Sequence, residues 1–445
     1  MTERSPIVSR RSLLKGAAAG AALAVAGPLV EGRAAPRALA AAGTRPYPRL
    51  AAGTDTLPHI DHVVVLMMEN HSFDNHLGSL RRKGVDGLSF GRDGRAVNWN
   101  PSPSGGRVYA RPAPSTCQAH YRVGQDWDAS HRSWNHGAND GFVAACSPEA
   151  MQYYTAGQLP FYHSLASVFP VCDRYFASVM AQTYPNRRFL IAGSAFGQVG
   201  DPFPSPTDPD PRPGRYGTIF DMLNAFGISW KDYFADLPTA GLFPYVVEQN
   251  PGKVVPVADF FADCAAGTLP FFSLVDPESF EGSEENPQDV QAGAYYAYRV
   301  IDAVMNSPAW GSTLLVLTFD EHGGYYDHVP PVRAVRPDGI APAVAAGDTY
   351  GDLYSWTGFR VPTVVVSPWA RPHHVSHTVY DHTSILRLIE TKWNLPALSA
   401  RDANANNMLD CLDLRRPAFA EPPVLTPAPP PTGLAGCIAA DPTGQ

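Results

Sequence analysis

Charged residues are scarce in this sequence, and basic residues do not cluster in it. Only 17% of the 445 residues are charged, and the formal net charge is −8. An acidic balance without a Lys/Arg-rich patch argues against a nucleic-acid-binding protein. After residue 40, no apolar run approaches the roughly 20 residues of a membrane-spanning helix. The remaining class is a globular protein, and 44% hydrophobic residues are enough for a sizeable core.

The sequence also lacks the paired cysteines of a zinc knuckle. No two of the six cysteines are spaced as a CxxC pair; they are Cys117, Cys146, Cys172, Cys264, Cys411 and Cys437. In an exported protein an even number of cysteines favours disulfides. The sequence does not decide their pairing, and buried free thiols are the alternative.

An export signal is expected at the N-terminus. Residues 9–12 read SRRS, a twin-arginine pattern, and an Ala/Gly/Leu/Val-rich run covers 16–30. Residues 38–40 (ALA) then offer small side chains for cleavage. We expect residues 1–40 to be a twin-arginine signal peptide that engages the twin-arginine export machinery. The protein is then expected to be secreted or associated with the cell wall.

Strand-like and helix-like segments alternate along the rest of the chain. Buried strands are predicted at 60–68, 228–234, 271–275, 313–318 and 361–367. Helices are predicted at 218–226, 289–306 and 385–393. This alternation predicts an α/β fold with a mostly parallel central sheet sandwiched by helices.

Composition suggests the boundaries of the folded domain. We expect an N-terminal arm at 41–57, one domain at 58–416 and a poorly packed Pro/Ala-rich tail at 417–445. Within the domain, the polar, Gly/Pro-rich residues 81–125 predict an irregular excursion over the surface.

The strand at 313–318 ends in two adjacent carboxylates. Asp320 and Glu321 follow it, with His322 beside them, and a Gly-Gly pair then turns the chain. Ligands bind at the carboxyl ends of strands in α/β sheets, and adjacent acids repel each other unless a cation lies between them. A divalent cation is therefore the simplest explanation. The alternative is a solvated turn with ordinary surface acids.

A second strand end supplies further oxygen ligands. The strand at 60–68 runs into Glu69 and Asn70. Together with Asp320 and Glu321, these side chains can hold one hard or borderline dication. Oxygen ligands suit Ca²⁺, Mg²⁺ or Mn²⁺, and a hydrolytic Zn²⁺ is a further alternative.

Thr183 is the candidate nucleophile. Pro185 suits the first turn of a helix, which puts Thr183 just before the helix N-terminus. Free N–H groups and the helix dipole there favour a phosphate, and a metal-bound hydroxyl loses its proton more readily. The alternative is that Thr183 only caps its helix.

Cationic groups must also meet the phosphate, because three carboxylates largely cancel the charge of a dication. We place His131 and Arg187 among the catalytic candidates, and His322 and His328 among the groups that face the substrate. The alternatives are that His131 is a packed core histidine and that Arg187 pairs with a local acid.

Four segments of the chain form a set of motifs: 68–78 (MENHSFDNHLG), 183–187 (TYPNR), 319–329 (FDEHGGYYDHV) and 376–386 (SHTVYDHTSIL). This set resembles the bacterial phospholipase C and acid phosphatase family, which belongs to the alkaline-phosphatase-like superfamily. The resemblance covers roughly 58–415 and implies an alkaline-phosphatase-like fold.

The resemblance also implies roles for single residues. Glu69, Asn70, Asp320 and Glu321 would bind one divalent metal ion. Thr183 would attack a phosphate ester and form a phosphoenzyme.

The sequence departs from the family at two histidines. Many members have histidine in the position of Asn286, within residues 285–290 (ENPQDV). An amide can hydrogen-bond the substrate but cannot donate a proton at neutral pH. His131 falls in a His-bearing segment of the family, but Gln125 stands where an earlier histidine is frequent.

These features predict a secreted, metal-dependent phosphoesterase. The first expectation is a phospholipase C that hydrolyses glycerophospholipids to diacylglycerol and a phosphorylated head group through a phospho-threonine. A broad-specificity acid phosphatase is the alternative, and a catalytically silent phospho-ligand-binding protein is a third. An apolar trough lined from 153–176 or 233–245 would favour a phospholipid and transient contact with a membrane surface. An open polar cleft would favour a small phosphate ester.

Overall fold

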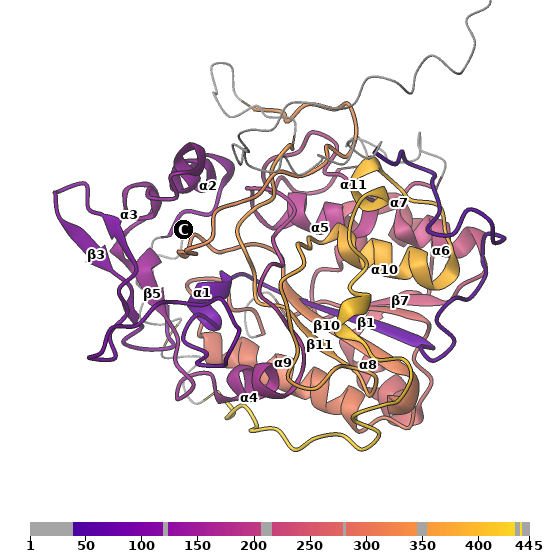
Figure 1. The fold of residues 1–445 in the computed structure, drawn as a ribbon. Helices are drawn as coiled ribbons and strands as arrows, with labels where there is room; N and C mark the ends of the chain where they lie inside the picture. Colours follow the sequence, from indigo (N-terminus) through magenta and orange to yellow (C-terminus); the bar gives the residue numbers. More distant parts are fainter. Residues whose placement is uncertain are drawn as a thin grey trace, which may run out of the picture. The chain divides into compact units, whose positions relative to one another are not determined.

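An eight-stranded sheet runs through the part of the chain that the computed structural model describes (Figure 1). This part belongs to one compact unit and comprises residues 39–118, 123–205, 216–278, 282–344, 354–431 and 437. Apart from residues 39 and 40, the expected signal peptide lies outside the described residues.

The sheet is mostly parallel, as predicted. In spatial order its strands are β12 (Val375–Ser376), β6 (Val171–Cys172), β11 (Val364–Val366), β10 (Thr313–Phe319), β1 (His62–Met68), β9 (Phe272–Val275), β7 (Trp230–Phe234) and β8 (Val254–Pro256). Neighbouring strands are parallel except at β11, which is antiparallel to both β10 and β6. β11 is shorter than the predicted strand because Pro362 has no N–H to extend the ladder.

β1 and β10 lie side by side at the centre of the sheet. They pair in parallel from His62 opposite Thr313 to Met68 opposite Phe319. Almost every residue of the two strands is apolar or β-branched and buried, as expected for strands covered on both faces. Because the strands are in register, they end at the same level of the sheet.

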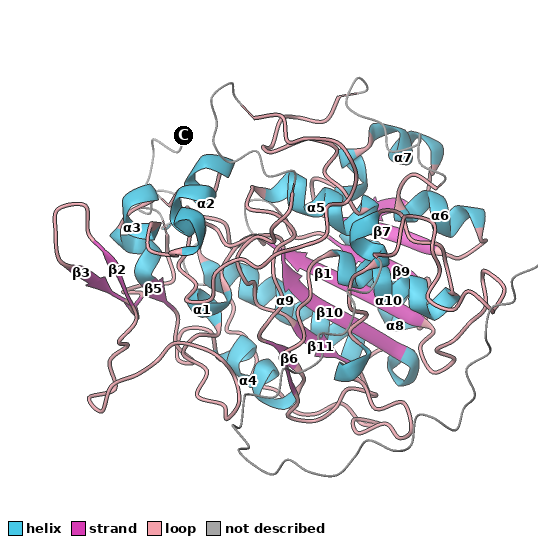
Figure 2. Ribbon diagram, turned by 45° about the horizontal axis from the view of Figure 1, so that its top comes forward, coloured by secondary structure: helices cyan, strands magenta, loops and turns pink. Residues whose placement is uncertain are grey.

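Helices cover both faces of the sheet (Figures 1 and 2). α4, α8 and α9 lie on one side of it, and α5, α6 and α10 lie on the other. The helices are α1 (Phe73–His76), α2 (Trp127–Trp134), α3 (Phe142–Ala145), α4 (Pro160–Val168), α5 (Thr183–Ala192), α6 (Ile219–Ala225), α7 (Pro244–Gln249), α8 (Val257–Ala266), α9 (Val290–Met305), α10 (Thr383–Trp393) and α11 (Ala400–Ala403). Short 3-10 turns cover Asn135–Gly137, Pro148–Met151, Thr239–Leu242, Trp310–Ser312 and Leu409–Cys411. None of the described helices combines the length and the apolar character that crossing a membrane requires.

The predicted helices form where the sequence signals placed them. α9 buries its apolar stripe, which includes Val290, Ala297 and Val304. α6 begins at a capping box in which Thr218 and Asp221 exchange side-chain and backbone hydrogen bonds. The α/β fold class predicted from the sequence is therefore confirmed.

The segment 81–125 is more regular than predicted. β2 (Trp99–Pro101) pairs with β3 (Arg107–Tyr109), and β4 (Arg111–Pro112) pairs with β5 (Gln152–Tyr153). These short ladders satisfy backbone groups that an irregular loop would leave to water.

The two flanking segments pack onto the domain. In the arm, the Thr56 N–H donates to the backbone oxygen of Lys392 over 2.7 Å. The described residues of the tail are exposed or half-buried apart from Ala428 and Cys437, and Phe419 accepts a hydrogen bond from Trp310. A disulfide between Cys117 and Cys437 links the tail covalently to the domain. The free cysteines are Cys146, Cys172, Cys264 and Cys411.

Candidate active site

The ends of β1 and β10 bring the predicted metal ligands together. The Asp320 N–H donates to the backbone oxygen of Met68 over 3.1 Å, which fixes the two strand ends against each other. Asn70, Asp320 and Glu321 are buried, and Glu69 is partly exposed. The segments 69–70 and 320–321, which are about 250 residues apart in the sequence, thus meet at one edge of the sheet.

Gly323 allows the turn after β10 to approach the end of β1. Its φ is +63°, and a Cβ added there would lie 2.1 Å from the backbone oxygen of Asn70. The Gly323 N–H donates to the Glu321 carboxylate over 2.7 Å, which orients that side chain. Glycine is therefore needed at position 323 because any side chain there would collide with the backbone of Asn70.

Arg187 bonds to the acids of the site. Its guanidinium lies 3.1 Å from Asp320 Oδ2, 3.3 Å from Glu69 Oε1 and 2.9 Å from Asp276 Oδ1. These contacts agree with the alternative given in the sequence analysis, in which Arg187 pairs with nearby acids. Arg187 therefore holds two predicted ligands at a fixed spacing, and its catalytic role stays a prediction.

The buried carboxylates hold protons more tightly than ordinary surface acids. Burial raises the pKa of Glu69 to about 7 and that of Asp320 to about 7, with neighbouring acids adding to the effect and Arg187 opposing it. Burial and the adjacent Asp320 raise the pKa of Glu321 well above its usual range. Such a cluster is stabilised by additional positive charge.

A cavity of about 370 Å³ is lined by Thr183 and by Glu69 of this cluster, whereas Asn70, Asp320 and Glu321 are not among its described lining residues. Thr183 is the first residue of α5 rather than the residue before it, and only 6% of its surface is exposed. Glu69 and Arg187 line the same cavity. The apolar part of the wall consists of Phe203, Pro204, Leu237, Pro238, Leu242, Pro244 and Pro277.

Part of the apolar wall comes from one of the two segments expected to form a trough. Residues 237–244 fall within the predicted 233–245, whereas 153–176 contributes no described lining residue. The wall is built from proline and leucine rather than from phenylalanine and tyrosine of that segment. The aromatic lining residues, Tyr184 and Phe203, come from other parts of the chain.

Asp201 is a cavity residue that the sequence analysis missed. The Tyr184 N–H, in the first turn of α5, donates to Asp201 Oδ1 over 2.7 Å. Burial raises the pKa of Asp201 to about 6. Asp201 precedes a loop that is rich in aspartate and proline, and nothing in the sequence distinguishes it from the other acids there.

Asp276 and Glu285 also line the cavity and were not predicted. Asp276 follows β9 directly, so the rule that acids at strand ends mark the site could have found it. Glu285 accepts a hydrogen bond from Gln125 over 2.6 Å. Its neighbour Asn286, the predicted substrate-binding residue, is not among the described residues that line the cavity.

Two predicted histidines lie away from the cavity lining. His131 Nδ1 is 2.7 Å from the backbone oxygen of Trp127, and the two rings pack at 4.2 Å. His322 Nδ1 is 3.2 Å from Glu321 Oε2, and burial lowers the pKa of His322 to about 3. His131 has the contacts of a packed core histidine, and His322 adjoins a predicted ligand as a neutral ring. Their catalytic and substrate-binding roles stay predictions.

His328 belongs to a different cluster of charges. Its Nδ1 lies 2.7 Å from Asp74 Oδ2, and Arg360 bridges Asp74 and Asp327. Burial alone would lower the pKa of His328, but Asp74 and Asp327 raise it to about 9. His328 therefore acts here as a partly buried cation within an ion network, and contact with substrate stays a prediction.

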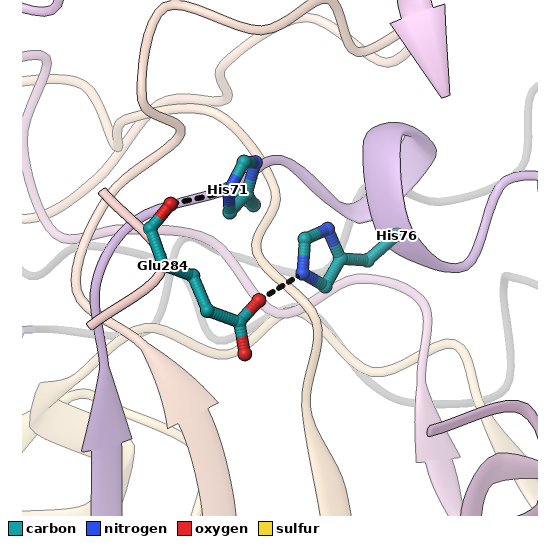
Figure 3. A group of neighbouring side chains, drawn as sticks. All are labelled: His71, His76 and Glu284. Atoms are coloured by element: carbon teal, nitrogen blue, oxygen red, sulfur yellow. Dashed lines mark hydrogen bonds and ion pairs between the residues drawn. The ribbon is translucent and has the colours of Figure 1, made fainter. Parts of the chain in front are cut away.

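A third cluster lies directly behind the end of β1 (Figure 3). His71 Nε2 donates to the backbone oxygen of Glu284 over 2.8 Å, and His76 is 2.5 Å from the Glu284 carboxylate. The Glu284 N–H donates to the backbone oxygen of Glu69 over 2.9 Å. These contacts hold Glu284, the residue before Glu285, against the end of β1.

Two groups in the described part of the chain have the spacing of a metal site. They are His71–His76–Glu284 and Asp74–Asp327–His328, with ligand atoms within 4.8 Å of one another. Neither contains a predicted metal ligand. The predicted carboxylates are spaced more widely, and the Arg187 guanidinium contacts both Glu69 and Asp320.

The predicted ligands nevertheless fit a hard cation. Asn70 Oδ1 and Glu321 Oε1 are buried oxygens without a hydrogen-bond partner among the described residues. Unpartnered buried oxygens are unusual, and Asp320 and Glu69 supply further oxygen donors beside them. An all-oxygen set of this kind suits Ca²⁺, Mg²⁺ or Mn²⁺.

The Phosphoesterase family model matches residues 60–396, which contain all the predicted site residues. The chain belongs to the Phosphoesterase family. The family expected from the four motifs is thereby confirmed. Membership does not by itself assign a role to any single residue of the site.

Relatives of this phosphoesterase are named as phospholipases C. Phospholipase C B of Mycobacterium tuberculosis is 31% identical over 467 residues, covering 91% of this chain and 84% of that protein. Non-specific phospholipase C4 of Arabidopsis thaliana is 30% identical and covers 79% and 71%. The non-hemolytic phospholipase C of Pseudomonas aeruginosa is 30% identical over 76% of this chain. The chain spans about half the length of that last protein, 54%. These names support a hydrolase acting on phosphate esters.

Solved structures resemble this phosphoesterase weakly. A protein in the alkaline phosphatase superfamily from Vibrio parahaemolyticus has a TM-score of 0.40 and 11% identity, covering 87% of this chain and 76% of that chain. Murine ectonucleotide pyrophosphatase/phosphodiesterase 5 has a TM-score of 0.35 and 13% identity, covering 57% and 95%.

Proposed function

We propose that this phosphoesterase is a secreted, metal-dependent phospholipase C. One observation carries the proposal: Thr183 shares a cavity with Glu69 and three further acids, and the rest of that cavity has an apolar wall. The carboxylates suit a phosphate held by a cation, and the wall suits the diacylglycerol part of the substrate. The names of the relatives support the same activity.

The metal would be held by oxygen ligands from the two strand ends, Glu69, Asn70, Asp320 and Glu321. When bound, a divalent cation lowers the pKa of an adjacent hydroxyl and offsets the charge of a phosphate. Arg187 keeps Glu69 and Asp320 in place through its two hydrogen bonds.

Thr183 performs the reaction in two steps. Its Oγ forms a bond to the phosphorus of a glycerophospholipid while the bond from phosphorus to the glycerol oxygen breaks, and the hydroxyl proton passes to the departing diacylglycerol. Water then attacks the phospho-threonine, a proton returns to Thr183, and the phosphorylated head group leaves. The Tyr184 N–H at the helix N-terminus donates to Asp201 in this structure, and a phosphate oxygen would bind there in both steps by displacing that carboxylate.

The test compares two substrates with and without a chelator. We expect the purified protein to release diacylglycerol from phosphatidylcholine, and the chelator to stop this release. Thr183→Ala should lower the rate about a thousandfold or more, whereas Thr44→Ala, in the exposed arm, should not. Mass spectrometry of the quenched reaction should find a phosphoryl group on Thr183.

Other outcomes identify the alternatives. Cleavage of p-nitrophenyl phosphate but not of phosphatidylcholine would make the protein an acid phosphatase. Metal binding without turnover of either ester would make it a phospho-ligand-binding protein. An unchanged rate in Thr183→Ala would remove the mechanism.

Export by the twin-arginine pathway is part of the proposal and rests on the sequence of residues 9–12. Replacing Arg10 and Arg11 by lysine should keep the protein inside the cell. The measurement is the share of the protein in the culture medium or cell wall, and unchanged export of this variant would contradict the proposal.

A further inference from the structure

Two large apolar side chains are exposed to solvent at the rim of the cavity. Phe203 is 79% exposed and Leu237 is 50% exposed, and both line the cavity. Apolar surface in water is unfavourable, so exposed apolar side chains beside a site indicate contact with an apolar partner. We refer to Phe203 and Leu237 as the apolar rim.

The apolar rim is continuous with the candidate active site. Leu237 follows β7, and β7, β9 and β1 are parallel, so their carboxyl ends share the edge of the sheet at which Glu69 lies. Phe203 stands two residues after Asp201, whose carboxylate is bonded to the first turn of α5. A partner that covers the rim therefore also reaches the opening of the cavity that contains Thr183.

Charge restricts which lipid surface the rim fits. Arg187 is the one cation among the described lining residues, against the carboxylates of Glu69, Asp201, Asp276 and Glu285. The chain as a whole carries a net charge of −8. An anionic surface would be repelled, whereas a zwitterionic surface would not.

We propose that the apolar rim inserts into the surface of a zwitterionic lipid layer and so brings Thr183 to the level of the lipid phosphates. The inference rests on the proposed function and adds the physical form of its substrate. The enzyme acts on lipid assembled in a layer, and the rim selects that form over dispersed molecules.

Binding to vesicles tests the rim without any turnover. All variants carry Thr183→Ala and are sedimented with phosphatidylcholine vesicles. Phe203→Ser with Leu237→Ser should lower the bound fraction, measured as a partition coefficient, about tenfold or more. The matched control is Val424→Ser with Ile340→Ser, which removes two apolar side chains that are 97% and 45% exposed and lie outside the cavity lining. Equal losses in the two pairs would overturn the proposal.

Lipid charge provides a second arm of the same experiment. Vesicles of phosphatidylglycerol should bind the protein more weakly than vesicles of phosphatidylcholine. Equal or tighter binding to the anionic vesicles would overturn the assignment to a zwitterionic surface. Thermal unfolding of each variant shows that it is folded.

Turnover separates this inference from the proposed function. With Thr183 intact, the ratio of activity on phosphatidylcholine vesicles to activity on soluble p-nitrophenyl phosphorylcholine should fall about tenfold in the rim variant. An unchanged ratio would overturn the role of the rim. If the unsubstituted protein cleaves neither ester, the proposed function fails, and the sedimentation result still decides the rim.

Discussion

The Tyr184 N–H donates a 2.7 Å hydrogen bond to the Asp201 carboxylate, in the first turn of the helix that carries Thr183. The N-terminus of a helix is a favourable place for a phosphate oxygen. Asp201 therefore occupies, with its own negative charge, a position that a substrate phosphate needs.

Replacing this competing charge should strengthen anion binding. We expect Asp201→Asn to lower the inhibition constant of inorganic phosphate about threefold to tenfold, because the amide is neutral and is displaced more easily. The inhibition constant is measured at fixed pH and metal concentration. Asp236→Asn, which removes an exposed acid next to Leu237, is the control for overall charge. Weaker inhibition in Asp201→Asn would show that the carboxylate supports the site instead.

Metal binding should stabilise the folded protein, because it compensates buried acids. At a free metal concentration of 100 times Kd, the free energy of unfolding should rise by about 2.7 kcal/mol. Thermal unfolding with Ca²⁺, Mg²⁺, Mn²⁺ or Zn²⁺ measures the effect and ranks the ions. Asp320→Asn should remove most of this stabilisation, and Asp93→Asn, an exposed acid, should keep it. The absence of stabilisation by all four ions would contradict the proposed metal site.

Gly323 should tolerate a methyl group poorly, and a second glycine provides a matched control. Gly323 and Gly94 both have positive φ, +63° and +78°, but only at Gly323 would a Cβ meet backbone, at 2.1 Å. Gly94→Ala should lower the free energy of unfolding by about 1 kcal/mol through φ alone. Gly323→Ala should lower it by about 3 kcal/mol or more, because the strand ends must separate. Denaturant unfolding measures both, and equal losses would contradict the close approach to Asn70.

The stability of the protein should fall at alkaline pH through His328. Its pKa is about 9 in the folded protein and 6.5 without the fold. The folded state therefore favours the protonated ring, and this stabilisation is complete below pH 6.5 and is lost as the pH rises through 9. It amounts to about 3 kcal/mol.

Substitution isolates this contribution from other titrating groups. His328→Gln should remove most of the decrease in the free energy of unfolding between pH 7 and pH 10, whereas His59→Gln, at an exposed position, should leave it. An unchanged pH dependence in His328→Gln would assign the effect to other groups.

The central sheet and its main helices were predictable because their apolar patterns are long and regular. β1, β10 and α9 all lie within two residues of their predicted bounds. The short strands β2 to β5 were not predictable, because pairs of two or three residues leave no periodicity. The contact of Phe419 with Trp310 was not predicted, because the proline-rich composition around Phe419 is typical of a poorly packed tail.

The site was predictable where a strand carries its residues to the sheet edge. Glu69 and Asp320 follow from this rule, and Asp276 would have followed from applying it once more. Asp201 and Glu285 enter the cavity through loops whose paths depend on tertiary packing, so the sequence alone did not reveal them. Arg187 was identified, but its partners are carboxylates that follow the ends of three separate strands, a relationship that appears only in three dimensions.

The disulfide between Cys117 and Cys437 closes a covalent ring that spans 320 positions of the chain. Thr183, Asp320 and Glu321 lie inside this ring, and Glu69 and Asn70 lie outside it. A single proteolytic cut within the ring opens it without releasing a fragment until the disulfide is reduced. A cut between residues 70 and 117 instead leaves the two halves of the proposed ligand set joined only by the β1–β10 pairing and the contacts around it.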